Sequence, residues 1–503
     1  MTKFKRIASV ALSFLFLLPA MLSLSACKGK ADVVLRVFSW EEYIDEGGEG
    51  SYVYDVLEKK DAPSVIEDFE AWYEEVYHET VRVEYTTFGT NEDMYNKLLL
   101  GKEYDLLCPS DYMIMKLNAE GRIVPYDEDF FNPAIEENYY VRNVSPYIQS
   151  VFEGKIAIDQ YAAGYMWGTT GFVYNPEYAT PDDLANLGWG AFTSPLYTNR
   201  ITTKDNVRDT YFAALGLTYQ DELLDVVKLG DNAKLTEIFN RTDEETVSKV
   251  YDTLMAMKKN IYGFETDTGK ADLVSGKIWL NYAWSGDAVY AIDLAEDEDD
   301  IELNYYVPEA GSNLWFDGWV MTKSVEKRGT KQAAQAFVNF MSMPENAVRN
   351  SYYIGYTSVI AGEEMLKYAK YLYEDTEAEE TTDYDLGYFF GDTVKSEPII
   401  RADTEQASHR QLFAQFPSEE VIARCAVMNY FDANTNERIN ELWAKVKAER
   451  LDAWAIIVIC VTVVAIVLLV VFVKFGNKID FFRRKPKKGY ELVDQKPIRY
   501  DEA

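Results

Sequence analysis

The chain has 503 residues, of which 48% are hydrophobic and 15% aromatic, and its formal net charge is −33. Such acidity argues against binding to nucleic acid or to an anionic lipid surface and would draw cations toward the protein, although acidity that only maintains solubility is the alternative. With two histidines, four cysteines and no Cys-x-x-Cys pair, neither a metal centre nor another cofactor is expected.

The first 27 residues have the organisation of an export signal. Lys3, Lys5 and Arg6 precede an apolar run that extends through Leu22, and small residues lead directly to Cys27. This pattern resembles the bacterial lipoprotein signal, in which the cysteine becomes the lipidated first residue of the mature chain. A plain signal peptide that ends one residue earlier is the alternative.

Residues 33–108 predict alternating strands and helices. Segments 33–38, 81–85 and 104–108 are rich in strand-forming residues, and Ser64 and Thr90 each stand where an N-cap precedes a helical pattern. This alternation favours a parallel sheet with right-handed crossovers. Ligands of open α/β sheets lie beyond the carboxyl ends of the strands, so one rim is expected to carry the residues that follow the first and third strands: Trp40, Tyr43, Ser110 and Tyr112.

The middle of the chain repeats this style. Segment 169–174 predicts a strand, Asp205 opens a helix, and the apolar strand 278–283 delivers Trp284 to its carboxyl end. A further helix is expected to begin near Asp287, and Thr330 is expected to cap a long helix.

Several segments do not fit this alternation. Segments 45–61 and 373–404 are expected to be surface insertions, and the acidic run 296–300, which lacks calcium-loop spacing, is expected to be a solvated loop. A disulfide between Cys108 and Cys425 is possible, but Cys108 ends an apolar strand and is more simply a buried small side chain.

The C-terminal region predicts a membrane anchor. Residues 453–473 contain no charged residue, and at ~1.5 Å per residue they would span the ~30 Å of bilayer hydrocarbon. Basic residues follow between 474 and 488, which places the C-terminus in the cytoplasm and the rest of the chain outside. The tail 474–503 is short and is expected to be disordered rather than catalytic.

Three tryptophans stand beside carboxylates in separate segments: Trp40, Trp284 and Trp315. An indole face attracts an ammonium group and packs on methylenes, while a neighbouring carboxylate takes the charge. The pattern is therefore suited to a hydrophobic cation, although an ordinary core tryptophan beside a surface acid would look the same.

The order of motifs resembles one known family. Residues 38–43 match its aromatic-x-Trp-x-Glu-Tyr opening, residues 90–98 its helix with Asn-Glu-x-Met-Tyr-x-Lys-Leu, and residues 104–110 its Tyr-Asp-Leu-x-x-Pro-Ser segment. Over about residues 34–447 the chain is similar to the extracytoplasmic spermidine/putrescine-binding proteins of polyamine ABC transporters. The resemblance implies an α/β, two-lobed, periplasmic-binding-protein-like fold of type II, with a hinge and an interlobe cleft, here followed by the C-terminal transmembrane helix.

The resemblance also implies lobe boundaries and site residues. Residues 33–167 and 315–363 would form one lobe and residues 168–314 and 364–450 the other, with chain crossings near 167–168, 309–314 and Glu364. Trp284 would stack on the ligand opposite Trp315, Asp317 and Asp209 would pair with its amino groups, and Asn206 stands where a relative has an acid, which leaves spermidine or putrescine open. The implied ligand-binding set is Trp40, Tyr43, Ser110, Tyr112, Asn206, Asp209, Trp284, Trp315, Asp317, Tyr356 and Asn429.

The leading functional hypothesis is therefore capture of a polyamine by closure of two lobes, followed by delivery to the subunits of an ABC permease, without bond chemistry. The protein would lie on the extracytoplasmic face of the cytoplasmic membrane, held by lipid at Cys27 and by its single-pass helix. A hydrolase that binds and cleaves glycans with Asp205 and Asp209 as acid and base is a second hypothesis, but such a pair should flank the bond rather than lie on one helix. A membrane-tethered polyamine or cation sensor is a third.

Overall fold

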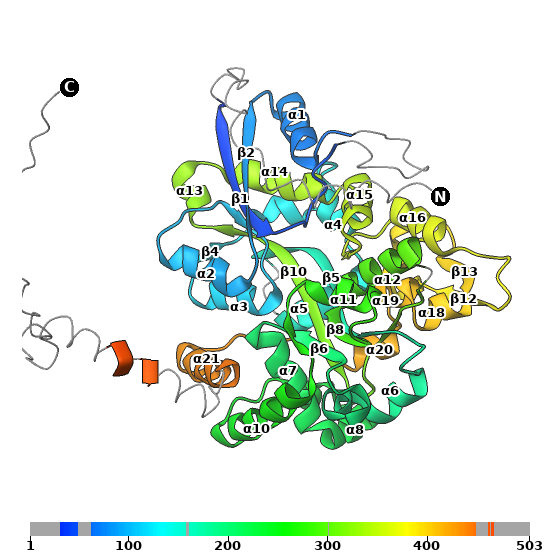
Figure 1. Cartoon of the computed structure of the whole chain (residues 1–503). Helices are drawn as coiled ribbons and strands as arrows, with labels where there is room; N and C mark the ends of the chain where they lie inside the picture. The colour runs from blue at the N-terminus through cyan, green and yellow to red at the C-terminus, as the bar shows by residue number, and fades with distance from the viewer. Residues whose placement is uncertain are drawn as a thin grey trace, which may run out of the picture. The chain divides into compact units, whose positions relative to one another are not determined.

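The computed structural model describes residues 31–48, 62–156, 160–299, 301–448, 461–462 and 464–466 (Figure 1). The described residues up to Val446 form one compact unit, and those from Lys447 onward belong to a second unit. The predicted signal 1–27, with Cys27, lies outside the described residues, and so does the predicted membrane span 453–473 apart from residues 461–462 and 464–466. Within the described part, no helix has the length and apolar character that crossing a bilayer requires.

A large mixed sheet runs through the compact unit, with the strand order β2-β1-β3-β10-β5-β8-β6-β7. In that order its strands are β2 (Val81–Phe88), β1 (Val33–Trp40), β3 (Leu106–Leu107), β10 (Ser312–Thr322), β5 (Ala162–Tyr174), β8 (Leu280–Trp284), β6 (Ile201–Lys204) and β7 (Gly263–Glu265). Four short strands pair with the two central strands: β4 (Ile123–Val124) and β14 (Cys425–Ala426) with β10, and β9 (Asn304–Tyr306) and β11 (Thr357–Ser358) with β5.

Two long antiparallel strands connect two parallel regions. β1 pairs in parallel with β2 and β3, as the sequence predicted, and β6 pairs in parallel with β7 and β8. Between them, β5 pairs antiparallel with β10 through Thr169 and with β8 from Thr170 onward. β5 therefore passes from one region into the other (Figure 1). We call the half with β1–β3 the first lobe and the half with β6–β8 the second lobe; the predicted lobe boundaries stay predictions.

Helices surround both regions of the sheet (Figure 1). Up to β5, the helices are α1 (Val65–Tyr77), α2 (Asn91–Leu99), α3 (Asp111–Ala119), η1 (Glu128–Phe131), α4 (Tyr139–Asn143) and α5 (Pro146–Ile156). The middle of the chain forms α6 (Pro181–Leu187), η2 (Gly188–Thr193), η3 (Pro195–Tyr197), α7 (Val207–Thr218), α8 (Gln220–Leu229), α9 (Asn232–Phe239), α10 (Glu244–Asn260), α11 (Thr268–Val274) and α12 (Ser285–Asp299). After β10 come α13 (Ser324–Arg328), α14 (Lys331–Met341), α15 (Pro344–Ile354), α16 (Glu363–Tyr373), α17 (Gly387–Phe390), η4 (Gly391–Thr393), α18 (Thr404–Ser408), α19 (Gln411–Gln415), α20 (Glu419–Ala423) and α21 (Ala433–Lys447).

Side-chain caps fix the starts of several helices. Ser64 forms a capping box with Glu67 at the start of α1, and the Thr90 side chain accepts from the Asp93 backbone N–H at the start of α2. The predicted helix at Asp205 begins one residue later, because the Asn206 side chain is the N-cap of α7. Thr330 holds the predicted N-cap position of α14, but its side chain makes no capping hydrogen bond.

The acidic run 296–300 was wrongly predicted to be a loop, because α12 continues through Asp299. Acidic residues oppose the helix dipole at this end. They are tolerated here because Arg410 forms an ion pair with Glu296, and the Gln411 side chain donates to Asp293 and Glu296.

Described parts of the two predicted insertions make specific contacts. Asp45, the first residue of segment 45–61, is fully buried and pairs with Arg349, which also binds Asp68. Segment 373–404 contains a two-stranded antiparallel sheet of β12 (Thr381–Asp385) and β13 (Ile399–Asp403). A buried ion pair thus holds Asp45, and strand pairing orders part of segment 373–404.

Cys108 and Cys425 are both buried and no disulfide joins them. The Cys425 thiol donates to the Val421 carbonyl, so these side chains behave as small core residues, as the sequence favoured for Cys108.

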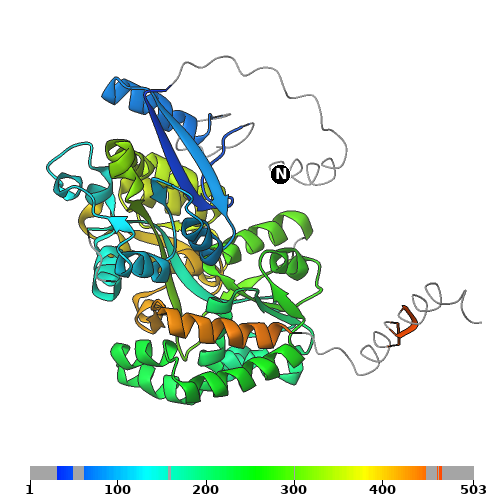
Figure 2. The same cartoon turned by 90° about the vertical axis from the view of Figure 1, so that its left-hand side faces the viewer.

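The last helix of the compact unit, α21, lies beside the helices of the second lobe (Figure 2). Its Trp443 ring packs edge-on against that of Phe264, at 5.1 Å between ring centroids.

Candidate ligand-binding site

The end of β1 delivers Trp40 and Tyr43 to the carboxyl rim of the first lobe. Between them the chain turns through Glu42, whose φ of +49° is unusual for a residue with a side chain. The Tyr43 ring is buried, and its backbone carbonyl accepts a 2.7 Å hydrogen bond from the Tyr165 hydroxyl. Trp40 is partly buried, with its ring 4.6 Å from that of Phe88. The predicted rim therefore exists, and β5 holds the tyrosine in place.

Asp317 lies opposite a bulge of β5: Asp317 pairs with Met166 and Gly318 with Gly164, so Tyr165 of β5 is the extra residue. The Tyr43 hydroxyl donates a 2.5 Å hydrogen bond to the Oδ2 atom of Asp317. The backbones of Ser110 and Asp317 form an isolated antiparallel β-bridge. Burial and the Asp317 charge raise the pKa of Tyr43 well above its usual value, so the phenol keeps the proton that it donates. Bulges commonly re-aim a side chain, and here the bulge directs a carboxylate to the rim.

One oxygen of Asp317 has no partner among the described residues. The residue is 5% exposed, and its Oδ1 atom is buried without a hydrogen bond of normal geometry. Burial raises the pKa of Asp317 to about 6, against the lowering effect of the Tyr43 and Ser110 hydroxyls, and the charge of Asp209 raises it further. A buried carboxylate with an unused acceptor is costly alone and is stabilised by a cation.

Aromatic rings surround this carboxylate. Tyr356 lies edge-on to Tyr43 at 5.6 Å and tilted to Trp315 at 5.5 Å between ring centroids. Trp315 is itself held by β10 and donates from its indole nitrogen to the Thr169 carbonyl at 3.1 Å. The three rings form an apolar wall beside Asp317, of the kind that accommodates the methylenes and charge of an alkylammonium ion.

The Trp-Ser-Gly-Asp segment at the end of β8 supplies the second lobe's contribution. A Cβ atom on Gly286 would lie 1.7 Å from the Tyr356 ring, so only glycine allows that ring to lie here. The Tyr356 hydroxyl then donates to Asp287 at 3.1 Å. The sequence places this acid in the Trp-Ser-Gly-Asp segment, but no ligand role was predicted for it.

Asp287 is already paired within the protein. Its carboxylate lies 3.1 Å from the Lys204 ammonium and 3.3 Å from that of Lys270. Burial raises its pKa, but the two lysines outweigh burial, so the pKa of Asp287 is lowered overall. No role was predicted for Lys204 from the sequence. The local pattern there is only a lysine immediately before the Asp-Asn pair that precedes α7.

Asp209 lies in the first turn of α7 and is buried. The Asn206 side chain donates to it and also accepts from the Asp209 backbone N–H. Burial raises the pKa of Asp209 to about 6, while Lys204, Asn206 and Trp284 lower it. Asp209 and Asp317, which the sequence assigned to opposite lobes, are thus close enough for their charges to interact.

Arg208 joins the two lobes at the other end of the site. Its guanidinium lies 4.3 Å from the Tyr112 ring of α3 and 3.6 Å from the Phe431 ring. Tyr112 is fixed by Asn91 and Glu92, which contact its hydroxyl at 3.1 Å. This stack connects α7 of the second lobe with α3 of the first.

Asn429 meets the candidate site through its backbone. It is exposed, and its contacts are through the backbone: its carbonyl accepts from Arg208, and its N–H donates to Asn240. Its predicted contact with a terminal amine stays a prediction. The remaining predicted residues are linked by the contacts above or lie at the same rim.

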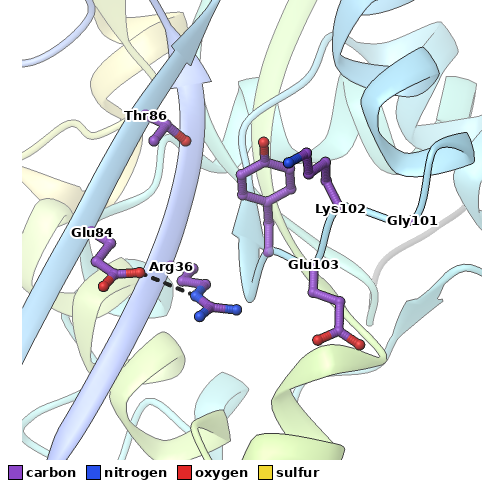
Figure 3. Close-up of a pocket in the computed structure, with 7 residues that line it drawn as sticks. Arg36, Glu84, Thr86, Gly101, Lys102 and Glu103 are labelled. Carbon is purple, nitrogen blue, oxygen red and sulfur yellow. Dashed lines mark hydrogen bonds and ion pairs between the residues drawn. The ribbon is translucent and has the colours of Figure 1, made fainter.

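A separate hollow of about 380 Å³ lies on the first lobe, away from these residues (Figure 3). Its lining residues are Arg36, Glu84, Thr86, Gly101, Lys102, Glu103 and Tyr104. Arg36 and Glu84 form a solvent-exposed ion pair there at 3.1 Å. Because its charges are exposed and already matched, this hollow has none of the desolvated acids of the interlobe site. Across the described residues, no group of metal-ligand side chains converges on a point that would hold a metal ion.

Several known proteins have sequences or folds similar to those of this chain. The model of a family described as bacterial extracellular solute-binding protein matches residues 64–370. The spermidine/putrescine-binding periplasmic protein of Salmonella typhimurium is 25% identical over 349 residues, which are 69% of this chain and 83% of that protein.

Two solved structures extend the similarity to the fold. The substrate-binding protein of a spermidine/putrescine ABC transporter from Streptococcus pneumoniae superimposes with a TM-score of 0.52 at 25% identity, covering 82% of this chain and 98% of that one. A lipoprotein of Treponema pallidum gives a TM-score of 0.53 at 18% identity, covering 82% and 99%, and supports the fold alone. The α/β periplasmic-binding-protein-like fold predicted from the sequence is therefore confirmed.

Proposed function

The chain belongs to the family of bacterial extracellular solute-binding proteins, and on this premise we propose that it captures a linear polyamine of the spermidine/putrescine class and delivers it to an ABC permease. The names of the relatives from Salmonella typhimurium and Streptococcus pneumoniae support this ligand class and this kind of partner. The observation that carries the proposal is the buried, partnerless Oδ1 atom of Asp317 beside the rings of Tyr43, Trp315 and Tyr356.

In this proposal an ammonium group of the ligand pairs with Asp317. Each charge-assisted hydrogen bond of this kind contributes about 1.5–3 kcal/mol net. Each aromatic face that receives the cation adds roughly 0.5–2 kcal/mol, and the rings also exclude water from the pair. Asp209, whose charge interacts with that of Asp317, receives a second ammonium group.

The other predicted contacts complete the proposal. Trp40, Ser110 and Tyr112 form the first-lobe wall, Trp284 packs on the ligand's methylenes from the second lobe, and Asn206 supports Asp209. Binding consists of lobe closure and charge pairing, and no bond of the ligand is broken. The interlobe stack of Arg208 on Tyr112 supports the view that closure completes the site.

We also propose how the protein is held. Lipid on Cys27 and a transmembrane helix at residues 453–473 anchor it to the extracytoplasmic face of the cytoplasmic membrane, with tail 474–503 in the cytoplasm. If the tail only anchors, deleting residues 474–503 should leave polyamine uptake intact. Loss of a polyamine response with normal uptake would instead favour the sensor hypothesis. Labelled fatty acid should enter the wild type and not Cys27→Ser; equal labelling would contradict the lipid anchor.

The deciding experiment is calorimetric titration of the full-length protein in detergent with spermidine, putrescine and a maltooligosaccharide. We expect saturable heat with at least one amine and none with the sugar. Absence of heat with both amines would refute the proposal, and heat with the sugar alone would favour the glycan hypothesis.

A further inference from the structure

Lys204 is a buried ammonium group inside the second-lobe half of the site. It ends β6, and only 3% of its side chain is exposed. Its Nζ atom lies 4.3 Å from the centre of the Trp284 ring, 3.1 Å from Asp287 and 3.6 Å from Glu265, and it donates to the Thr266 carbonyl. Burying a lysine in this way is expensive unless every proton meets an acceptor, and here acceptors surround it.

These contacts are the ones that an ammonium group of a ligand would make. Trp284 was predicted to pack on the ligand, and Lys204 already lies over that ring. Asp287 belongs to the same site, because the Tyr356 hydroxyl that binds it lies on the ring that contacts Tyr43 and Trp315. The protein therefore supplies one cation of its own at a cation-binding position.

Two acids of the site remain without such a partner. Among the described residues, neither Asp317 nor Asp209 forms an ion pair with a lysine or arginine, whereas Asp287 forms two. Asn206 adds no charge at the position beside Asp209. Asp317 and Asp209 can thus each pair with one ammonium group of a ligand, and a third ammonium group would meet the Lys204 ammonium on Trp284.

We propose that Lys204 is a specificity-determining residue that takes the place of one ligand ammonium group on Trp284 and Asp287. Resting on the proposed function above, this restricts the site to linear cations with two ammonium groups and discriminates against a triamine. The discrimination has two sources: repulsion by the lysine and the prior occupation of the acid that a third ammonium group would need.

The test compares putrescine, a diamine, with spermidine, a triamine, by calorimetry on the full-length protein in detergent. The wild type should bind putrescine more tightly. Lys204→Met keeps the length of the side chain and removes its charge, so the affinity for spermidine relative to putrescine should rise at least about tenfold, the value of one charge-assisted contact. If thermal unfolding shows that Lys204→Met does not fold, the double variant Lys204→Met with Glu265→Gln is used in its place, because it restores the local charge balance.

The matched control is Lys277→Met. Lys277 also pairs with an acid, Asp272, and lies 4.7 Å from an aromatic ring, that of Tyr262, but it is on the surface of the second lobe. Its removal should leave the ratio of affinities unchanged. A wild type that binds both amines but favours spermidine, or a folded Lys204 variant with an unaltered ratio, would overturn the inference and leave the proposed function standing. A wild type that binds neither amine would refute the proposed function itself.

Discussion

Tyr43 and Asp317 are 274 positions apart in the chain, yet the phenol of one donates a 2.5 Å hydrogen bond to the carboxylate of the other. This bond satisfies Oδ2 and leaves Oδ1 buried and unpartnered. The tyrosine therefore orients the carboxylate without neutralising it, which is the condition for pairing with an incoming cation.

Asp317→Asn should lower amine affinity by about 2–5 kcal/mol, because it strands a buried ammonium group beside a neutral amide. Tyr43→Phe should lower it by only about 0.5–1.5 kcal/mol, since the carboxylate remains and loses one hydrogen bond. Calorimetric titration of the two variants measures both values. Equal effects, or an unchanged Asp317→Asn, would contradict the assigned roles.

Amine affinity should depend on pH near 6. Burial raises the pKa values of Asp317 and Asp209 to about 6 in the unliganded protein, and a protonated carboxyl does not pair with an ammonium group. Affinity should therefore rise as pH increases through about 6 and level off above it. Titrations between pH 5 and 8 measure this, with Asp317→Asn as the control, in which Asp209 alone of the two acids still titrates and the pH dependence is reduced. A wild-type affinity independent of pH would exclude both acids as the binding groups.

The stability of the unliganded protein should follow pH in the opposite direction. Each acid has a pKa of about 6 when folded, against 3.8 as the reference value, so the folded state holds the proton more tightly. The stabilisation by protonation is complete at low pH and is lost as pH rises from about 4 through 6, to an extent of about 3 kcal/mol per acid. Denaturant unfolding of the wild type and of Asp317→Asn at several pH values isolates this contribution. An identical pH profile in the variant would contradict it.

Gly286→Ala should impair binding through Tyr356. The new methyl group would lie 1.7 Å from the ring, which must move away from Tyr43, Trp315 and Asp287. Overpacking of this kind destabilises by about 1–3 kcal/mol and should lower amine affinity as well. Gly190→Ala is the control, because nothing lies within 4 Å of its added Cβ atom. Thermal unfolding measures the stability of both variants, and calorimetry measures their amine affinity. Equal stability and equal affinity of the two variants would refute the packing argument.

The sequence predicted the elements that local chemistry determines. Strand-forming runs, the Ser64 cap and the Thr90 cap lie where expected, and the rim residues Trp40 and Tyr43 follow from the rule for carboxyl ends of parallel strands. Asp317 came from the family resemblance, since no local pattern indicates the bulge that aims it.

The internal cations could not be predicted in this way. Lys204 pairs with Asp287, 83 residues away, and Arg208 reaches Tyr112 on the other lobe, so neither contact has a local signal. The acidic run at the end of α12 was wrongly predicted to be a loop for the same reason. Arg410, which pairs with Glu296, lies 114 residues further along the chain. A run of charged residues indicates a solvent-exposed segment only when no residue distant in the sequence pairs with those charges.

The position of Asp317 on β10 has a mechanical consequence. Asp317 lies on one of the two strands that run through both lobes, close to any axis about which one lobe would turn against the other. A rigid turn about those strands would therefore displace Asp317 very little. An arriving amine would thus meet its first counter-charge at a nearly stationary pivot, before the outer walls swing shut around it.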